Sequence, residues 1–400
     1  MRFVSEWVMV AATPRFLAEI MALCAGGTVF LLAVILVRRL YRSRYFRRRD
    51  ECAVQVRRNW AKIVGGTIPP ETWLSDALMA EVVEEMLLES IGAAGGQELT
   101  GLLECLQASG LLHRMIYQAR RSKGWKQRNA LIALGRSRSA EAIPILAEAL
   151  DSDDLEMRIA GVRGLGRIAS PKAASPILDR LLGKSFNVPV LPVKNALLSC
   201  CRPDPSFLIS YVGSAQGEVR ETLARVLAEI ATPDLGNELV LLASDPSAEL
   251  RASGARALAQ APPEFGIPLL VDLTMDEIWF VRLRAVVSLG TLHHPASIPA
   301  LVRTLCDTNR MVRMRSAHAL AEFTEEATEI VERIVSSEDR YALQAYVSEL
   351  QRRSTFQTAI TAINTRCPDP TRRMLLAAVK NAYDGLSQDA APAENIVARP

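Results

Sequence analysis

The sequence is poor in the residue types that most often serve catalysis or metal binding. It contains four histidines in 400 residues, which are His113, His293, His294 and His318. They are dispersed, and two of them precede a proline in a predicted turn, where a solvated side chain is more common than a metal ligand. No glycine-rich phosphate loop is present, since Gly161, Gly164 and Gly166 lie inside a predicted helix. We therefore expect no catalytic residue, no metal ion and no cofactor.

Cysteine and aromatic residues are also scarce. The seven cysteines are odd in number and show no C-x-x-C spacing, which argues against a disulfide framework and agrees with a reducing compartment. Cys200 and Cys201 are adjacent, which is more typical of small core residues than of a redox pair. Aromatic residues make up 6% and hydrophobic residues 49% of the chain, and no strand-like run separates the predicted helices. This composition indicates an all-α protein built from Ala and Leu.

One long apolar run lies near the amino terminus. Residues 20–37 contain no charged side chain, and residues 16–37 contain only Glu19. At about 1.5 Å per residue such a helix spans about 27 to 33 Å, which matches the hydrocarbon core of a bilayer. In a signal peptide the basic residues would precede the run, whereas here most of them follow it, and no A-x-A site closes it. We predict a transmembrane helix over residues 16–37, preceded by a short extracytoplasmic or interfacial segment, residues 1–15.

A basic juxtamembrane segment, residues 38–58, follows the apolar run. It contains nine arginines against two acidic residues, a net charge of +7; residues 1–37 are neutral, which leaves −4 of the overall +3 for residues 59–400. The positive-inside rule places this side of the span in the cytoplasm, so we expect a single-pass inner (plasma) membrane protein with its amino terminus outside. Seven of the arginines serve either as a topology signal or as a site for anionic lipid headgroups: Arg38, Arg39, Arg42, Arg44, Arg47, Arg48 and Arg49.

A 31-residue period organises the rest of the chain. It is clearest over residues 218–322, where arginines recur at Arg220, Arg251, Arg282 and Arg313. Small residues recur at the same spacing at Ala228, Ala259, Gly290 and Ala321. The period extends upstream to Arg158, Gly166 and Gly135 without an insertion. A fixed period without gaps is the signature of a solenoid, in which each unit stacks on the next through the same face.

Each period holds two predicted helices. In the segment MRIAGVRGLGRI, apolar residues such as Met157, Val162 and Leu165 line one helical face. The second helix opens with Ile-Pro, as at Ile298-Pro299, where the missing amide hydrogen costs nothing. Aspartates recur at the same period and are expected to cap the next helix: Asp245, Asp276 and Asp307. We expect the arginine column to pair with these aspartates across adjacent units.

The repeat carries the pattern V-R, two small residues and A-L-G, then a turn and A-I-P before a Leu-rich helix. It is clearest at Val281-Arg282, Leu289-Gly290 and residues 297–301. This pattern resembles the HEAT family, in particular its bacterial branch related to phycobiliprotein-lyase repeats. The resemblance implies a right-handed α-solenoid of HEAT-like helix pairs and little about activity. Another HEAT-repeat family, deoxyhypusine hydroxylase, binds iron through His-Glu pairs, which this sequence lacks.

The repeat frame is good over residues 125–339 and weaker on either side. Residues 59–124 are predicted to form a helical cap or degenerate repeats, and residues 340–386 a last repeat with capping helices. Within the array, Pro189 stands where arginine is expected, so Pro189 and Pro192 should shorten or kink their helix. The tail, residues 387–400, is predicted to be disordered.

A second column on the first helix of each pair is basic. By resemblance to HEAT arrays this helix lines the concave face, so its side chains would form a stripe that binds a partner. The residues of this basic stripe are Arg163, Lys194, Arg225, Arg256, Arg284, Arg315 and His318. A solvated face with internal ion pairs is an equally good explanation, since Glu221 and Glu229 each lie four residues from Arg225.

The sequence thus favours a membrane-anchored cytoplasmic HEAT-repeat scaffold without catalytic activity, which binds a partner protein through its concave face. An inner-membrane enzyme, a transporter or a polysaccharide-synthesis complex would be such a partner. The alternative is a lyase-like HEAT enzyme acting on a protein-bound chromophore, which requires Cys200 or Cys201 as a nucleophile. Nucleic-acid binding is not expected, because residues 59–400 are mildly acidic.

Overall fold

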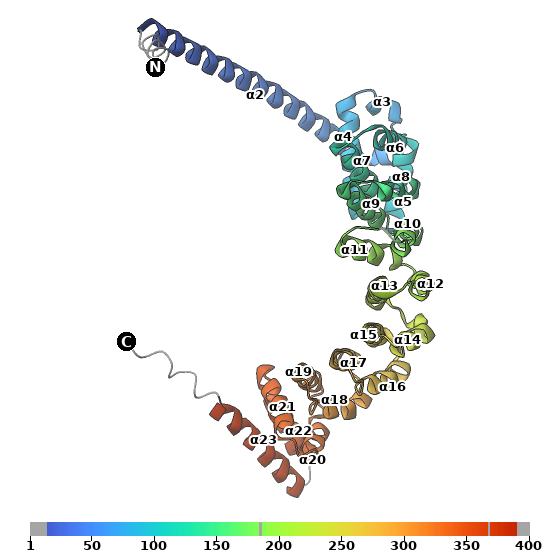
Figure 1. The fold of residues 1–400 in the computed structure, drawn as a ribbon, viewed down its shortest axis with the longest axis vertical. Coiled ribbons are helices and arrows are strands. Elements are labelled where there is room, and N and C mark those ends of the chain that lie inside the picture. Colours follow the sequence, from blue (N-terminus) through green and yellow to red (C-terminus); the bar gives the residue numbers. More distant parts are fainter. Residues whose placement is uncertain (1–13, 184–185, 367–368, 390–400) are drawn as a thin grey trace, which may run out of the picture. The chain divides into compact units, whose positions relative to one another are not determined.

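The computed structural model describes residues 14–183, 186–366 and 369–389, and these form an all-α protein (Figure 1). Over these ranges there are 22 α-helices, five short 3-10 helices and no strand. The helices gather into two compact units, Met1–Ala142 and Ile143–Pro400. The boundary between the units therefore falls after Trp125, the residue at which the sequence places the start of the repeat array.

The first unit begins with one continuous helix, α2 (Pro14–Val64), of 51 residues. It runs through the predicted transmembrane and basic segments, so the expected boundaries at residues 37 and 58 are not breaks in the backbone. Leu, Ala and Arg favour the helix, and no proline follows Pro14 within it. The side chains of residues 20–37 are exposed. Among the described residues this is the one helix long and apolar enough to cross a bilayer, with a mean hydropathy of 2.7 over its most apolar part.

The carboxyl-terminal part of α2 packs on the rest of the first unit. Cys52, Val56 and Ile63 are buried at helical spacing, and α2 contacts α4 and α5. The other α-helices of this unit are α3 (Pro70–Leu74), α4 (Ala77–Ala93), α5 (Gly96–Ala108), α6 (Leu111–Arg121) and α7 (Trp125–Arg136). The predicted cap over residues 59–124 is helical, and its first helix is the end of α2. Residues 1–13 of the expected interfacial segment lie outside the described residues.

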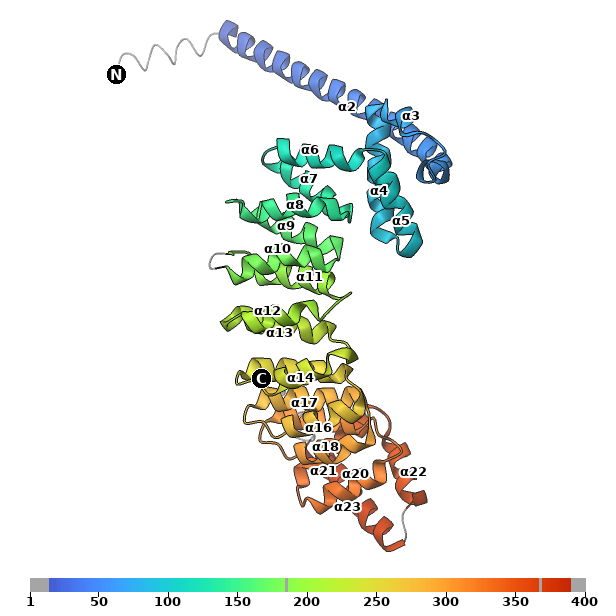
Figure 2. The same ribbon diagram turned by 90° about the vertical axis from the view of Figure 1, so that its right-hand side faces the viewer.

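The second unit stacks helix pairs in chain order, as Figure 2 shows for α8 to α13. Successive first helices contact one another and form the first-helix layer: α9 (Leu155–Ile168), α11 (Val190–Cys201), α13 (Gly217–Ile230), α15 (Ala248–Ala257), α17 (Trp279–Leu292), α19 (Arg310–Leu320) and α21 (Arg340–Arg352). The second helices form the other layer: α8 (Ile143–Glu148), α10 (Pro171–Leu182), α12 (Phe207–Ser214), α14 (Gly236–Ala243), α16 (Pro263–Leu273), α18 (Ile298–Thr304), α20 (Ala327–Ser336) and α22 (Phe356–Arg366). The predicted all-α solenoid is confirmed.

Short connections and one last helix complete the fold. The 3-10 helices are η1 (Ala140–Ala142), η2 (Ala149–Asp151), η3 (Pro233–Leu235), η4 (Leu258–Gln260) and η5 (Pro295–Ser297). The chain ends in α23 (Asp369–Asp389), which packs on α21 and α20. This helix continues past Ser387, where the sequence places the start of a disordered tail; the rest of that tail lies outside the described residues.

Two sequence signals explain how the pairs form. Proline opens second helices as expected, since Pro171 and Pro263 are the first residues of α10 and α16. The turn before the second helix is left-handed at equivalent positions of two units, with φ of 54° at Ala169 and 45° at His293. In the degenerate unit, α11 starts directly after Pro189, four residues later in the repeat than α9 and α13, so the prolines delay the start of this helix; its 12 residues lie within the range of the other first helices, from 10 in α15 to 14 in α9.

Glycine at the repeat positions permits close helix packing. A Cβ on Gly164 would lie 2.6 Å from Cδ2 of Leu146, and one on Gly254 would lie 2.6 Å from the backbone nitrogen of Ala243. A Cβ on Gly166 would lie 2.7 Å from Cα of Ala196 in the next unit. These distances are too short for any side chain to fit without movement. Close helix packing therefore accounts for the glycines at positions 164, 166 and 254.

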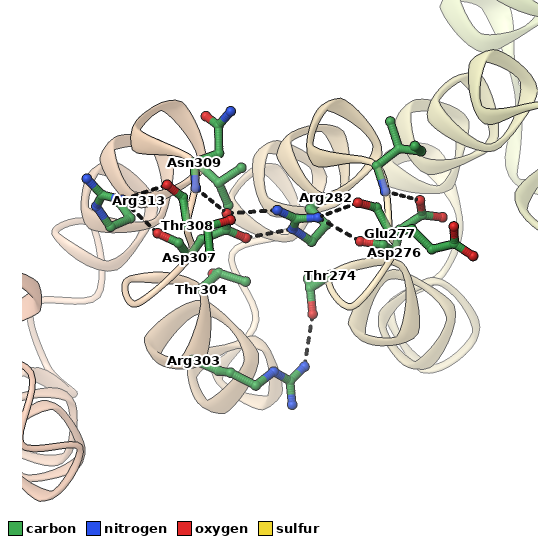
Figure 3. A network of polar contacts seen from close by, with 12 residues as sticks. Thr274, Asp276, Glu277, Arg282, Arg303, Thr304, Asp307, Thr308, Asn309 and Arg313 are labelled. Carbon is green, nitrogen blue, oxygen red and sulfur yellow. Dashed lines mark hydrogen bonds and ion pairs between the residues drawn. The ribbon is translucent and has the colours of Figure 1, made fainter.

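An arginine–aspartate ladder links successive pairs. Arg220, Arg251 and Arg282 each form an ion pair with the aspartate 25 residues further along, at 2.7, 2.7 and 2.6 Å; their partners are Asp245, Asp276 and Asp307. Figure 3 shows Arg282 between two loops: Nε donates to Asp307, and Nη1 donates to the carbonyl oxygens of Asp276 and Glu277 at 2.8 and 3.0 Å. The predicted pairing of the two columns is confirmed for these three arginines.

The prediction that these aspartates cap the next helix is wrong in detail. Each carboxylate accepts a hydrogen bond from the amide two residues later, which belongs to the N-cap residue rather than to the first helical turn; for Asp276 the donor is Ile278 N, at 2.9 Å. The carboxylate thus closes the loop before the helix while it holds the arginine. At the ends of the ladder, Arg158 and Arg313 bind loop carbonyls instead of a carboxylate.

Candidate functional site

The first-helix layer presents the basic stripe at one position of successive helices. Arg163 on α9, Lys194 on α11, Arg225 on α13 and Arg256 on α15 are 31 residues apart and are exposed or half-exposed. They recur along the layer because the repeats have equal length and neighbouring first helices contact one another. Within the second unit this layer lies on the inner side of the bend in Figure 1, as expected for a concave face.

Glutamates neutralise the middle of the stripe. Glu229 on α13 forms ion pairs with Lys194 of the preceding first helix and with Arg256 of the following one, the latter at 3.3 Å. Burial opposes ionisation of Glu229, but the hydrogen bond and charge of Lys194 and the charge of Arg256 outweigh it and lower its pKa. Arg225 pairs with Glu221 at 3.3 Å and lies 3.9 Å from Glu249. For these cations the structure shows the internal pairing that the sequence left as one of two explanations.

His318 also lies in a network of ion pairs. Its Nδ1 is 2.7 Å from Oε1 of Glu349 on α21, and that carboxylate also accepts hydrogen bonds from Arg352 and Arg353. The hydrogen bond from Arg352 is the largest influence on Glu349 and, with those from His318 and Arg353, lowers its pKa to about 2 despite partial burial. His318 therefore links α19 to α21, and its ring nitrogens are already engaged by side chains of α21 and by Arg353.

Three arginines of the stripe have no such partner. Arg163, Arg284 and Arg315 are exposed and make no hydrogen bond or ion pair within the part of the chain that the structure describes. Arg284 lines a cavity of about 380 Å³ on the first-helix layer, together with Glu229, Arg256 and Val287.

Exposed apolar side chains lie around the last two of these arginines. Met311 and Met314 on α19 are 46% and 52% exposed, and Val287 on α17 is 38% exposed. They share the outward helical face with Arg315 and Arg284, because residues three and four apart lie on one side of a helix. We call Arg284, Val287, Met311, Met314 and Arg315 the α17–α19 patch. The sequence analysis missed the apolar members of this patch because it followed charge alone. Met311 lies four residues before Arg315 and three before Met314, and this spacing could have indicated that the three side chains share a helical face.

The second-helix layer holds a larger cavity that is lined by two arginines, Arg303 and Arg333. It measures about 720 Å³ between α18 and α20 and includes the exposed Cys306. Its arginines are engaged, since Arg303 donates to Thr274 Oγ1 at 2.9 Å (Figure 3) and Arg333 pairs with Glu329 at 2.9 Å. No three His, Cys, Asp or Glu side chains gather as metal ligands within the described ranges. Arg303 keeps its positive charge, because its partner is a neutral hydroxyl, but Glu329 and Glu332 also line the cavity and make it a poor site for an anionic ligand.

The seven juxtamembrane arginines divide into two groups. Arg48 forms an ion pair with Asp76, the N-cap residue of α4, at 2.9 Å, and Arg49 pairs with Glu85 on α4. The hydrogen bond that Arg49 donates to Glu85 raises the pKa of Arg49. The other five, Arg38, Arg39, Arg42, Arg44 and Arg47, are exposed and have no acidic partner among the described residues.

Comparison with known proteins bears on the repeats. A family model described as HEAT repeats matches residues 114–188 and 267–351. No curated protein matches the chain. Among solved structures, an engineered protein is 18% identical and covers 79% of this chain and 98% of its own, with a TM-score of 0.34. Human deoxyhypusine hydroxylase is 18% identical over 60% of this chain and 97% of its own, with a TM-score of 0.26. Kap95p, solved with RanGDP, is 13% identical over 78% of this chain and 49% of its own, with a TM-score of 0.41. At these values the structures indicate nothing about what this chain binds.

Proposed function

Because residues 114–188 and 267–351 are HEAT repeats in an all-α solenoid, we propose that the protein is a membrane-anchored scaffold that binds a partner protein through its first-helix layer. The α17–α19 patch is the observation that carries this proposal. Two arginines that have no partner within residues 14–183, 186–366 and 369–389 lie beside exposed methionine and valine side chains there, a combination suited to a segment with both carboxylates and apolar residues. A preformed layer of helices would bind such a segment with little ordering cost of its own.

The α17–α19 patch also decides which variants test the proposal. Charge reversal at Arg225 or Arg256 would break internal ion pairs, so loss of binding there would be ambiguous. Arg284→Glu with Arg315→Glu breaks no ion pair among the described residues. We expect this double variant to lose a partner that the wild-type protein captures from detergent-solubilised membranes. Lys172→Glu, at an exposed cation on α10 in the other layer, is the matched control and should capture it normally. Equal capture by all three proteins would contradict the proposal.

Membrane anchoring is the second part of the proposal and is supported by the apolar run of α2. Eighteen consecutive uncharged residues lie exposed on a helix and bury nothing within their own unit. We expect the full-length protein to remain in the membrane pellet after carbonate extraction and to float with lipid vesicles. Release by carbonate would contradict an integral anchor.

The proposed orientation places the repeats in the cytoplasm of a bacterial cell, with the amino terminus outside. The arginines that follow the apolar run support it through the positive-inside rule. Cys306 is exposed on the second unit and provides a natural reporter. A membrane-impermeant maleimide should label Cys306 only after the membrane has been opened. Labelling of Cys306 in intact cells would contradict this orientation and place the repeats outside the cytoplasm.

We propose that the scaffold performs no chemical step of its own. The lyase-like alternative, the finer part of the family resemblance, needs an accessible thiolate. Cys200 and Cys201 are fully buried, and burial raises their pKa values to about 11 and about 12. Sγ of Cys200 also donates to the carbonyl oxygen of Leu165 at 3.3 Å, as a core thiol does. Replacing both cysteines with alanine should leave partner capture and any cellular phenotype intact; loss of the phenotype with capture retained would favour an enzyme.

A further inference from the structure

The division of the juxtamembrane arginines points to a second binding surface. Arg48 and Arg49 are held by acidic groups of α4, so their charges are already matched within the protein. The five arginines before Arg48 face solvent without an acidic partner in the part of the chain that the structure describes. Aromatic side chains lie among them: Tyr41 is 75% exposed, and the Arg42 guanidinium lies 5.5 Å from the ring centroid of Phe46. A cluster of arginines without acidic partners, with aromatic side chains between them, is typical of a helix segment at a membrane interface.

The continuity of α2 sets how far these arginines lie from the apolar run. Because the helix has no break between Val37 and Arg47, these two residues are separated by about 15 Å along the axis at 1.5 Å per residue. The headgroup layer is about 5 to 8 Å thick on each side of a bilayer, and charge acts over about 8 Å more at physiological salt. All five arginines therefore fall within the range of headgroup phosphates when residues 20–37 occupy the hydrocarbon core.

The same helix enters the folded unit without a linker. From Ala18 onward, Cys52 is the first buried side chain of α2, and Val56 and Ile63 follow on the same face. Sγ of Cys105 on α5 reaches the carbonyl oxygen of Ile63 at 3.6 Å. The stretch between the apolar run and the packed part of α2 is thus a continuous helical stalk, which consists mainly of aromatic side chains and the five arginines that have no acidic partner among the described residues.

We propose that Arg38, Arg39, Arg42, Arg44 and Arg47 form a binding surface for the phosphates of anionic phospholipids, whereas Arg48 and Arg49 attach the stalk to α4. This inference rests on the proposed membrane anchor and adds a lipid class to it. A lipid surface is favoured over nucleic acid because the cations directly adjoin an exposed apolar helix and the charge of residues 59–400 is negative. Guanidinium groups suit phosphate because they donate several hydrogen bonds in a fixed geometry.

The test uses the full-length protein reconstituted into vesicles of phosphatidylcholine alone or of phosphatidylcholine with 30% phosphatidylglycerol. After mild detergent extraction, native mass spectrometry counts the phosphatidylglycerol molecules that stay bound to each chain. A variant in which Arg38, Arg39, Arg42, Arg44 and Arg47 are all changed to glutamine should retain fewer phosphatidylglycerol molecules per chain than wild type, by a factor of about three or more. The matched variant, Arg48→Gln with Arg49→Gln, should retain as much as wild type. A five-lysine variant should retain an intermediate amount, since it keeps the charge without the guanidinium.

The outcomes separate the two proposals. Failure of wild type to float with either vesicle contradicts the membrane anchor. If wild type floats with the vesicles but retains no more phosphatidylglycerol than the five-glutamine variant, the lipid-binding surface is contradicted and the membrane anchor is not. Binding of a labelled single-stranded RNA that depends on the five arginines, without any preference for phosphatidylglycerol, also overturns it. Far-UV circular dichroism of the five-glutamine variant must match wild type; since glutamine favours helix and no core side chain changes, we expect no loss of helicity.

Discussion

Arg251 and Asp276 face each other as a bidentate pair across two successive helix pairs. Nε of the arginine donates to Oδ2 at 2.7 Å and Nη2 donates to Oδ1 at 3.1 Å. The same guanidinium donates from Nη1 to the carbonyl oxygens of Asp245 and Pro246 at 3.0 and 2.9 Å. One side chain therefore joins the loop before its own helix to the loop before the next first helix. Because both groups are largely buried and the pairing is bidentate, this contact is stronger than a surface ion pair.

A double-mutant cycle measures this pair. We expect Arg251→Ala and Asp276→Ala each to lower the free energy of unfolding by about 2 kcal/mol, with an interaction energy of about 1 to 2 kcal/mol, measured by urea denaturation. The control cycle is Arg333 with Glu329 on α20, a half-exposed pair within one helix, for which about 0.5 kcal/mol or less is expected. Similar interaction energies in the two cycles would show that the Arg251–Asp276 pair contributes no more to stability than an exposed ion pair within one helix.

Stability should depend on pH through Glu349. Its pKa is about 2 in the folded protein against an ordinary value of 4.5, since Arg352, His318 and Arg353 favour the carboxylate. A lowered folded pKa means that the stabilisation is complete above pH 4.5 and is lost as the pH falls towards 2. The urea midpoint of Glu349→Gln should therefore lie below that of wild type at pH 7 and converge with it near pH 2. A constant difference over this range would contradict the assigned cause.

Glycine substitutions should separate packing from helix propensity. Gly254→Ala places a Cβ 2.6 Å from the backbone of Ala243, so we expect a loss of about 1 to 3 kcal/mol in stability. Gly213, in α12, has no atom within 4 Å of the same added carbon, and Gly213→Ala should stabilise the protein by up to about 1 kcal/mol. Thermal or urea unfolding compares the two variants. Stabilisation by Gly254→Ala would mean that α14 and α15 can move apart freely.

Substitution of alanine by glycine should change stability in opposite directions at Ala169 and Ala231, which occupy equivalent positions of two repeats. Ala169 has φ of 54° and ψ of 46°, which costs an alanine about 1 kcal/mol, so Ala169→Gly should raise the free energy of unfolding by several tenths of a kcal/mol. Ala231 occupies the same position two periods later with φ of −52° and ψ of 142°. Ala231→Gly should therefore lower stability, because glycine adds chain entropy there without relieving strain. Destabilisation by both variants would show that the methyl group of Ala169 contributes more than the backbone costs.

Much of the fold was predictable because it repeats. The period of 31 follows from Arg220, Arg251, Arg282 and Arg313, and a gapless period requires equivalent contacts in each unit. The aspartate capping was mispredicted because spacing alone does not reveal that Asp276 lies one residue too early to reach the first turn of α17. The continuity of α2 was missed because a change from apolar to basic residues changes the environment of a helix without breaking it.

The candidate site was less predictable. The sequence correctly placed the basic stripe on one layer but could not say which of its cations are free. Glu229 lies four residues from Arg225 and was one of two candidate partners under the explanation of internal pairing, yet it pairs with Lys194 and Arg256 on the neighbouring helices. Pairing within one helix follows from sequence spacing, whereas pairing between helices depends on how adjacent units are offset.

The amino-acid sequence by itself determined the helix pairs, their period, the apolar run and the arginines beside it, because these depend on local propensity and on the regular return of small and apolar residues. Only the tertiary structure decided that Arg284 and Arg315 have no acidic partner among the residues it describes and that Arg48 and Arg49 pair with acidic groups of α4. The reason is physical: a charge is matched or left free by the distance to groups far away in the chain, and that distance exists only after the helices have packed.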